Sequence, residues 1–302
     1  MKNPVHFTRL TALFLFTAIL AGHWDIWWHG AVGRESFWVP PHLLLYSCIA
    51  LSVLLGLYGW WRFHEKAWRH AAFALVFVLL AGPFDELWHR LFGKETIDSL
   101  LIIWSPPHLM IVAAFITSFA FLLPLIRKDP DENARRFMGA FMWAAIISLL
   151  FFLARPFNPT GSFKVMGFWG ASMLAMAIVW PLLKSQKWLG GFAPATLVSV
   201  ILMAITSITF GGKISPDVRA IPHGDFPSFL VIFSYFAGAL AMDLLIHKPR
   251  WIRGALYGLL WGSILFGFSS PFFEPVFHYS GFEAGQAILA AVAGGLIAGL
   301  LP

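Results

Sequence analysis

Two short segments of the sequence combine aspartate and histidine at a spacing that suits metal binding. Asp25 is followed by His29 four residues later, and Asp85 is followed by His89 at the same spacing, each time with a tryptophan just before the histidine. In a helix, residues i and i+4 lie on one face about one turn apart, so each pair can point to a common spot. An aspartate and a histidine held in this way can both bind one metal ion.

A second histidine follows each pair and comes directly after two prolines. Residues 40–42 read Pro-Pro-His after the first pair, and residues 106–108 read Pro-Pro-His after the second, so the pattern D-x-x-W-H … P-P-H occurs twice. Proline is tolerated in the first turn of a helix because its missing N–H is not needed there. We therefore expect His42 and His108 in the opening turn of a helix that folds back onto the preceding pair.

Each set offers two imidazoles and one carboxylate to a metal ion. Such sets suit non-haem Fe(II), nitrogen and oxygen ligands also suit Cu(II), and zinc accepts them too. The single cysteine, Cys48, excludes a cysteine-rich zinc or iron–sulfur site. The residue types therefore predict metal binding but leave the metal open between copper, iron and zinc. The predicted ligands are Asp25, His29, His42, Asp85, His89 and His108.

Other acids and histidines repeat the pattern only in part. Residues 221–223 read Ile-Pro-His without a preceding Asp/His pair. Glu274 and His278 have the i, i+4 spacing, but Pro275 between them disfavours a regular helix. His23 lies close to the first pair on another side of the expected helix. His223, Glu274, His278 and His23 are therefore further candidate ligands.

The segments that carry these residues are apolar enough to cross a membrane. Of the 302 residues, 59% are hydrophobic and only 12% are charged, about half the usual soluble share of roughly 25%. Apolar stretches of about 20 residues, the length that spans a bilayer, recur between short polar breaks. The sequence thus predicts an all-α, polytopic integral membrane bundle of about ten transmembrane helices, arranged as repeated hairpins in a single domain, 1–302. The expected spans lie near 9–28, 42–61, 70–89, 105–126, 137–155, 164–183, 192–211, 223–246, 254–271 and 282–301.

The charged residues between the spans predict the orientation in the membrane. Fourteen of the 21 Lys and Arg fall in one alternating set of breaks, which includes the N-terminus. Short loops rich in Lys and Arg stay in the cytoplasm, so both termini should be cytoplasmic. This arrangement accounts for the net charge of +6 without nucleic-acid binding. Ten of the 15 Asp and Glu and seven of the 11 His lie at the opposite face, which is periplasmic or exterior in a prokaryotic cytoplasmic membrane.

The first segment also resembles a known metal site. Residues 25–42 read DIWWHGAVGRESFWVPPH, which contains the pattern D-x3-H-x12-H, a Trp before the first His and a basic–acidic pair at residues 34–35. This segment resembles the metal-site segment of the C subunit of the particulate methane and ammonia monooxygenases. The resemblance implies copper ligands at the Asp and both His of this segment and, through the internal repeat, at those of the second. Residues expected to surround the ligands are Arg34, Glu35, Trp28 and Trp88.

The resemblance implies an O2-dependent copper monooxygenase or oxidase that acts on a small apolar substrate from the lipid. Its electrons would come from a quinol or a partner protein. Two other functions remain open: a metal-handling transporter, and an accessory or structural subunit of a larger membrane complex. A purely interfacial role is open too, since Asp and His at span ends can pair with Arg34, Arg90 or Lys94 and the Trp residues can form an aromatic belt.

Overall fold

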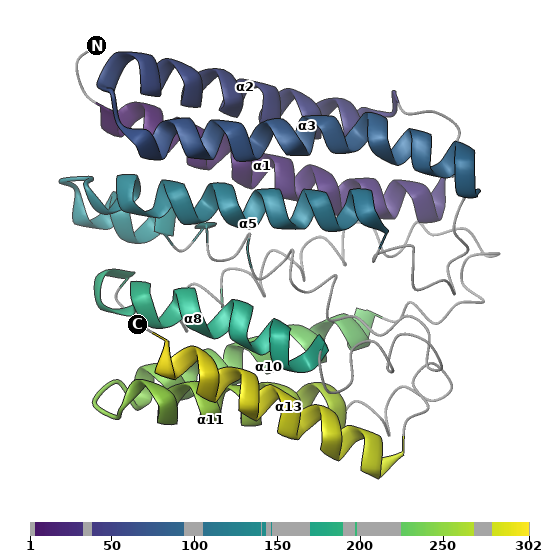
Figure 1. Ribbon diagram of the computed structural model, residues 1–302, viewed down its shortest axis with the longest axis vertical. Coiled ribbons are helices and arrows are strands. Elements are labelled where there is room, and N and C mark those ends of the chain that lie inside the picture. The colour runs from purple at the N-terminus through teal and green to yellow at the C-terminus, as the bar shows by residue number, and fades with distance from the viewer. Residues whose placement is uncertain are drawn as a thin grey trace. The chain divides into compact units, whose positions relative to one another are not determined.

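Every regular element in the described part of the chain is a helix, which confirms the expected all-α class (Figure 1). The structure is a computed structural model. It describes residues 4–32, 38–93, 105–139, 141–142, 146, 170–189, 197, 225–268 and 280–301. The chain forms two compact units, and each is described by itself.

The first unit is a bundle that contains four long helices (Figure 1). They are α1 (Pro4–Ala31), α2 (Pro40–Phe63), α3 (Lys66–Phe92) and α5 (Pro106–Arg127). Helix α1 packs against α2, α2 against α3, and α3 against α5, while α1 also touches α5. These bounds agree with the first four expected spans to within a few residues. Successive helices run in opposite directions, as expected for hairpins.

The described part of the second unit contains four helical segments. They are α8 (Ala171–Leu189), α10 (Asp225–Leu244), α11 (Arg250–Gly262) with its π-helical continuation η2 (Ser263–Phe268), and α13 (Gly281–Leu300). Helix α13 contacts α8, α11 and η2, and α10 contacts α11 and η2. Helix α13 begins with a capping box, in which the Ser280 hydroxyl accepts the N–H of Glu283 and the Glu283 carboxylate accepts that of Ser280.

Five helices of the described chain are long and apolar enough to cross a membrane: α2, α3, α5, α13 and the Pro4–Gly22 part of α1. Helices α8, α10 and α11 with η2 coincide in part with three further expected spans. The expected spans near 137–155 and 192–211 lie almost entirely outside the described residues. The expectation of ten spans is therefore matched at five positions and stays a prediction at the others.

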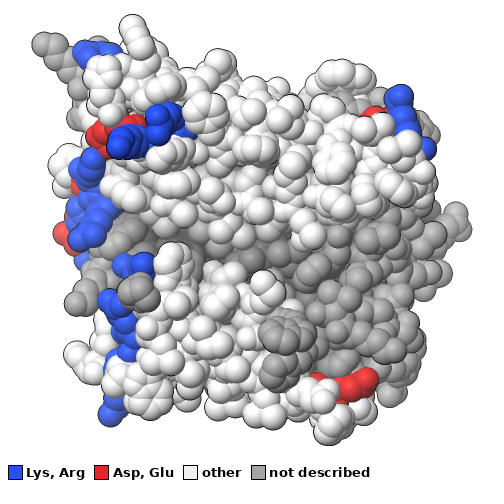
Figure 2. All heavy atoms as spheres, in the orientation of Figure 1, with Lys and Arg blue, Asp and Glu red and all other residues white. Residues whose placement is uncertain are grey.

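Large apolar side chains point outward along these helices. Leu54 on α2, Phe77 on α3 and Leu289 on α13 are 61%, 54% and 67% exposed. On the face shown in Figure 2, charged side chains gather near helix ends and the surface between them is uncharged. Soluble proteins rarely expose large contiguous apolar surfaces, whereas a bilayer accepts them. The surface therefore supports an integral membrane protein.

Glycine lets α11 and α13 approach each other more closely than any larger residue would. A Cβ on Gly254 would collide with the carbonyl oxygen of Gly295, and a Cβ on Gly295 would collide with that of Gly254. A Cβ on Gly294 would meet the backbone of Ser172 on α8 in the same way. In lipid the hydrophobic effect does not drive helices together. Small residues of this kind let membrane helices approach closely, so that van der Waals contacts hold them together.

This contact predicts opposite effects of two Gly→Ala changes in one helix. Gly295→Ala should lower the free energy of unfolding by about 1–3 kcal/mol, because its methyl group collides with the backbone of α11. Gly285→Ala should be neutral or stabilising by up to about 1 kcal/mol, since nothing lies within 4 Å of its added Cβ and alanine favours helix. Thermal unfolding in detergent measures both. Equal effects of the two changes would contradict the packing of α13.

A buried carboxylate links α1 to the turn that follows α5. Asp129, in the turn after α5, is 2% exposed and accepts hydrogen bonds from Nε and Nη2 of Arg9 on α1, both at 2.8 Å. Its Oδ1 also accepts the N–H of Asp131 at 3.0 Å. The hydrogen bonds from Arg9 hold the pKa of Asp129 below its ordinary value of 3.8.

The lowered pKa fixes the direction of a pH effect. The stabilisation from the ionised Asp129 is fully present above its ordinary pKa of 3.8 and is lost as the pH falls through the lower pKa of the folded protein. We expect Asp129→Asn to be less stable than wild type at neutral pH. The difference in stability between the two proteins should shrink as the pH falls below 3.8. Glu132→Gln, which alters an exposed i, i+4 pair with Arg136, is the control and should show almost no such difference. Thermal midpoints measured over this pH range test the effect, and a difference that widens in acid would refute it.

Candidate metal centre

Both Asp/His sets lie at the same end of the first unit's bundle. Asp25 and Asp85 lie in the C-terminal parts of α1 and α3, and His42 and His108 lie in the first turns of α2 and α5. Because successive helices are antiparallel, these four helix ends lie at one end of the bundle (Figure 1). The prolines occupy the first two positions of α2 and α5, as the sequence predicts.

The first set joins α1 to α2. Nε2 of His42 lies 3.0 Å from Oδ1 of Asp25, and the two side chains are 18% and 17% exposed. His29 lies on α1, four residues after Asp25, but its side chain is outside the described part. The hairpin thus brings the second histidine of the motif back to its aspartate.

The second set joins α3 to α5 through one carboxylate. Oδ2 of Asp85 lies 3.3 Å from Nε2 of His89 on the same helix, and Oδ1 lies 3.5 Å from Nε2 of His108. Each oxygen of Asp85 therefore faces one imidazole. This is the arrangement expected for D-x3-H followed by P-P-H.

The distances between these donor atoms can be compared with those around a metal ion. Two ligands that bind one ion at about 2.0–2.1 Å lie roughly 2.9–3.4 Å apart in octahedral or tetrahedral geometry. The three nitrogen–oxygen separations, 3.0, 3.3 and 3.5 Å, are close to this range. Among the side chains that the structure describes, no three His, Cys, Asp or Glu are arranged so that they could hold an ion as they stand. The described donors therefore form carboxylate–imidazole pairs whose separations match those of ion pairs and are also close to those of two ligands of one ion.

The basic residue nearest the second set has a different partner. Nε of Arg90 lies 2.9 Å from Oε1 of Glu86, and both side chains are well exposed. Asp85, one residue earlier, instead contacts His89 and His108. Arg90 thus pairs with Glu86 in place of the motif aspartate, while Lys94 lies outside the described residues, so the interfacial interpretation stays open.

Tyr46 is a residue of this region that the sequence motif did not include. It lies one turn after His42 on α2, and the two rings meet edge to face with centroids 6.0 Å apart. Its phenol is close enough to both Asp25 and Asp85 to interact with their charges. Tyr46 thus lies beside His42, near the aspartates of both sets. Its i+4 spacing from His42 was the signal that could have revealed it.

The two predicted tryptophan neighbours of the ligands pack against aromatic rings of their own helices. Trp28 meets Trp24 edge to face with centroids 6.1 Å apart. Trp88 lies between Phe84 and Phe92, at 6.4 and 4.3 Å. Each ring is therefore held in place beside its aspartate–histidine pair. The remaining candidates lie outside the described residues, namely Arg34, Glu35, His223, Glu274 and His278, as does the side chain of His23.

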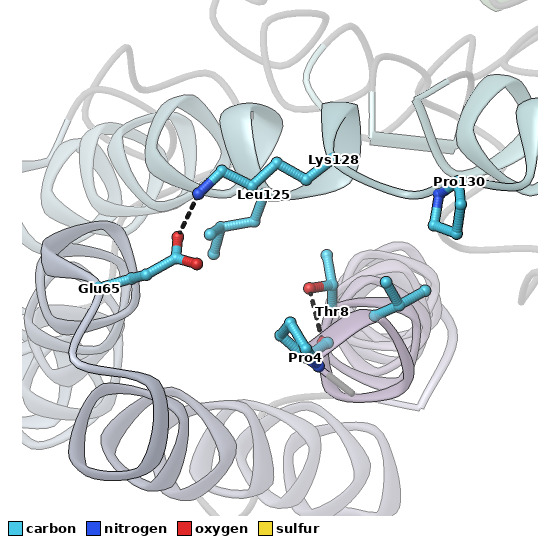
Figure 3. Close-up of a pocket in the computed structure, with 7 residues that line it drawn as sticks. Pro4, Thr8, Glu65, Leu125, Lys128 and Pro130 are labelled. Carbon is cyan, nitrogen blue, oxygen red and sulfur yellow. Dashed lines mark hydrogen bonds and ion pairs between the residues drawn. The ribbon is translucent and has the colours of Figure 1, made fainter. Parts of the chain in front are cut away.

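A pocket of about 260 Å³ lies at the opposite, basic end of this bundle (Figure 3). Lys128 and Glu65 form an ion pair of 2.7 Å at its edge, and Thr8 donates a hydrogen bond to the carbonyl oxygen of Pro4. The other lining residues are Val5, Leu125 and Pro130. This lining contains one carboxylate and no imidazole, so the pocket does not resemble the Asp/His sets.

Comparison with known proteins gives no family for this chain. No protein-family model, no curated protein and no solved structure matches it significantly. The function must therefore be inferred from the residues and their geometry.

The geometry predicts that Asp85 contributes more to metal binding than the neighbouring Glu86 does. Asp85→Asn should weaken Cu²⁺ binding roughly 10–100-fold or more, because it removes the charge that faces both imidazoles. Glu86→Gln, a change of equal size in the adjacent exposed carboxylate, should leave the affinity unchanged. Copper titration of the purified protein by calorimetry compares the two. Equal affinities would argue against Asp85 as a ligand.

Proposed function

We propose that this chain is an integral membrane metalloprotein that binds copper at the Asp/His end of its first unit. One observation carries the proposal: two carboxylates and three imidazoles from four helices lie at one bundle end, within contact distance in pairs. Ionisable groups in membrane helices are costly and are retained mainly for function. The proposed ligands are Asp25, His29 and His42 for one ion and Asp85, His89 and His108 for the other.

The resemblance to the copper monooxygenases selects copper among the metals that such ligands suit. Imidazole and carboxylate ligands are compatible with Cu(II), and also with non-haem iron and zinc. Bound copper would supply redox chemistry at this end of the bundle. The chain's own side chains would hold the ion, and Tyr46 would lie beside His42, near both aspartates.

The proposed arrangement in the membrane has ten spans, cytoplasmic termini and both Asp/His sets on the outer side. The charges of the first unit support it. Arg62, Lys66, Arg127 and Lys128 lie at the helix ends opposite the Asp/His sets. Clusters of Lys and Arg favour the cytoplasmic side of a membrane.

The proposed reaction is O2-dependent oxidation of a small apolar substrate that enters from the lipid, with electrons from a quinol or a partner subunit. Two features support an open site. Each set supplies only three protein ligands, which leaves coordination positions for other molecules. The five described side chains of the two sets are also partly exposed, between 13% and 29%.

The test is the metal content of the purified protein and of matched histidine variants. We expect one or two copper ions per chain, with a loss in His42→Ala and in His108→Ala. His70→Ala is the control, because His70 lies near the start of α3 at the basic end, beside Arg69. Elemental analysis by mass spectrometry gives the counts.

Three results would change the proposal. Iron in place of copper would keep the oxidative chemistry and break the link to the copper family. Copper retained in both variants would show that the ligands are wrong. No bound metal after reconstitution would favour an accessory subunit.

A further inference from the structure

The interior of the second unit contains polar groups that no described residue satisfies. The hydroxyls of Tyr235 and Tyr257 and the indole N–H of Trp261 make no hydrogen bond, and all three side chains are 0% exposed. Tyr235 lies on α10, and Tyr257 and Trp261 lie on α11. Two neighbouring helices therefore each place polar atoms in the core of this unit.

These three side chains lie together. Tyr257 and Trp261 are four residues apart on α11, so they share one face of the helix. The rings of Tyr235 and Trp261 have centroids 5.9 Å apart, and the indole N–H approaches the Tyr235 hydroxyl without reaching hydrogen-bond geometry. The two phenols are close enough to interact electrostatically. The polar atoms thus form one cluster at the contact of α10 with α11.

The backbone around the cluster is adapted to it. A Cβ on Gly238 of α10 would come within 2.8 Å of the Tyr257 ring, so glycine makes room for this tyrosine. Helix α11 changes to the π-helix η2 at Ser263, two residues after Trp261. Short π-helical turns interrupt the regular hydrogen bonding of a helix and occur frequently at functional sites.

A buried donor without an acceptor is unfavourable, because it loses the hydrogen bonds that it makes to water in the unfolded chain. Within a membrane protein no bulk water reaches such a group, so partners must come from the protein or from a bound molecule. The indole N–H can only donate, and a phenol hydroxyl donates as readily as it accepts. The group that completes the cluster must therefore offer an acceptor.

We infer that Tyr235, Tyr257 and Trp261 form a binding site for a small neutral molecule that presents a hydrogen-bond-accepting oxygen. A buried water and the carbonyl oxygen of a lipid-soluble quinone share this chemistry. The site is in the second unit and does not depend on the proposed copper centre.

Tyrosine-to-phenylalanine changes test the site, because they remove only the hydroxyl. If an acceptor is bound, Tyr235→Phe and Tyr257→Phe each remove a hydrogen bond and should lower the thermal midpoint by a few degrees. If nothing is bound, each change removes an unsatisfied donor and should leave the midpoint unchanged or raise it, which would overturn the inference. Tyr58→Phe on α2, where the side chain is 41% exposed, is the control and should have no effect.

The double variant tests whether both hydroxyls share one molecule. Contacts to a common partner are not independent, so the loss in Tyr235→Phe/Tyr257→Phe should differ from the sum of the two single losses. Strict additivity would show two separate hydrogen bonds and would overturn the shared site.

The accepting oxygen could belong to water or to a quinone. To distinguish the two, the thermal midpoints of wild type and the Tyr→Phe variants are measured again on delipidated protein, with and without 2,3-dimethoxy-5-methyl-1,4-benzoquinone. Destabilisation that persists without the quinone identifies water. Destabilisation that appears only with the quinone identifies a quinone carbonyl. Both results support an acceptor oxygen at the site, and no destabilisation under either condition rules it out.

Discussion

The contact between a carboxylate and an imidazole at the ends of membrane helices is the constraint on which the first unit depends. Asp85 faces His89 on its own helix and His108 on the next, and Asp25 faces His42 across the first hairpin. The contacts of Asp25 with His42 and of Asp85 with His108 each join the end of one helix to the start of the next. Ionisable groups within membrane helices are unfavourable unless they are paired, so the two contacts between helices favour the observed pairing of each hairpin.

The lipid environment accounts for the different ways in which the two units are held together. The first unit uses polar contacts at both ends of its helices, with Arg9 and Asp129 at the basic end. In the second unit, α11 and α13 meet through Gly254 and Gly295, where dispersion contacts replace a hydrophobic driving force. The polar cluster of Tyr235, Tyr257 and Trp261 is a separate feature within that apolar packing.

Much of the first unit could be predicted from the sequence. Helix starts at Pro40 and Pro106 and the return of His42 and His108 to their aspartates followed from proline chemistry and helical period. The position of Tyr46 did not, because nearly every face of a membrane helix is apolar and hydropathy does not indicate which face meets a neighbour. The contacts of α10, α11 and α13 were missed for the same reason. Arg34, Glu35 and the weaker motif at Glu274 and His278 lie outside the described residues and stay predictions.

The central claim is that the Asp/His end of the first unit binds copper through imidazole and carboxylate ligands. X-ray absorption at the copper edge of the metal-loaded protein tests it most directly, because the outer-shell scattering of imidazole identifies histidine ligands. If copper is bound there, we expect nitrogen and oxygen ligands at roughly 2.0 Å with two imidazoles per copper. A spectrum without imidazole scattering, or with sulfur in the first shell, would contradict it.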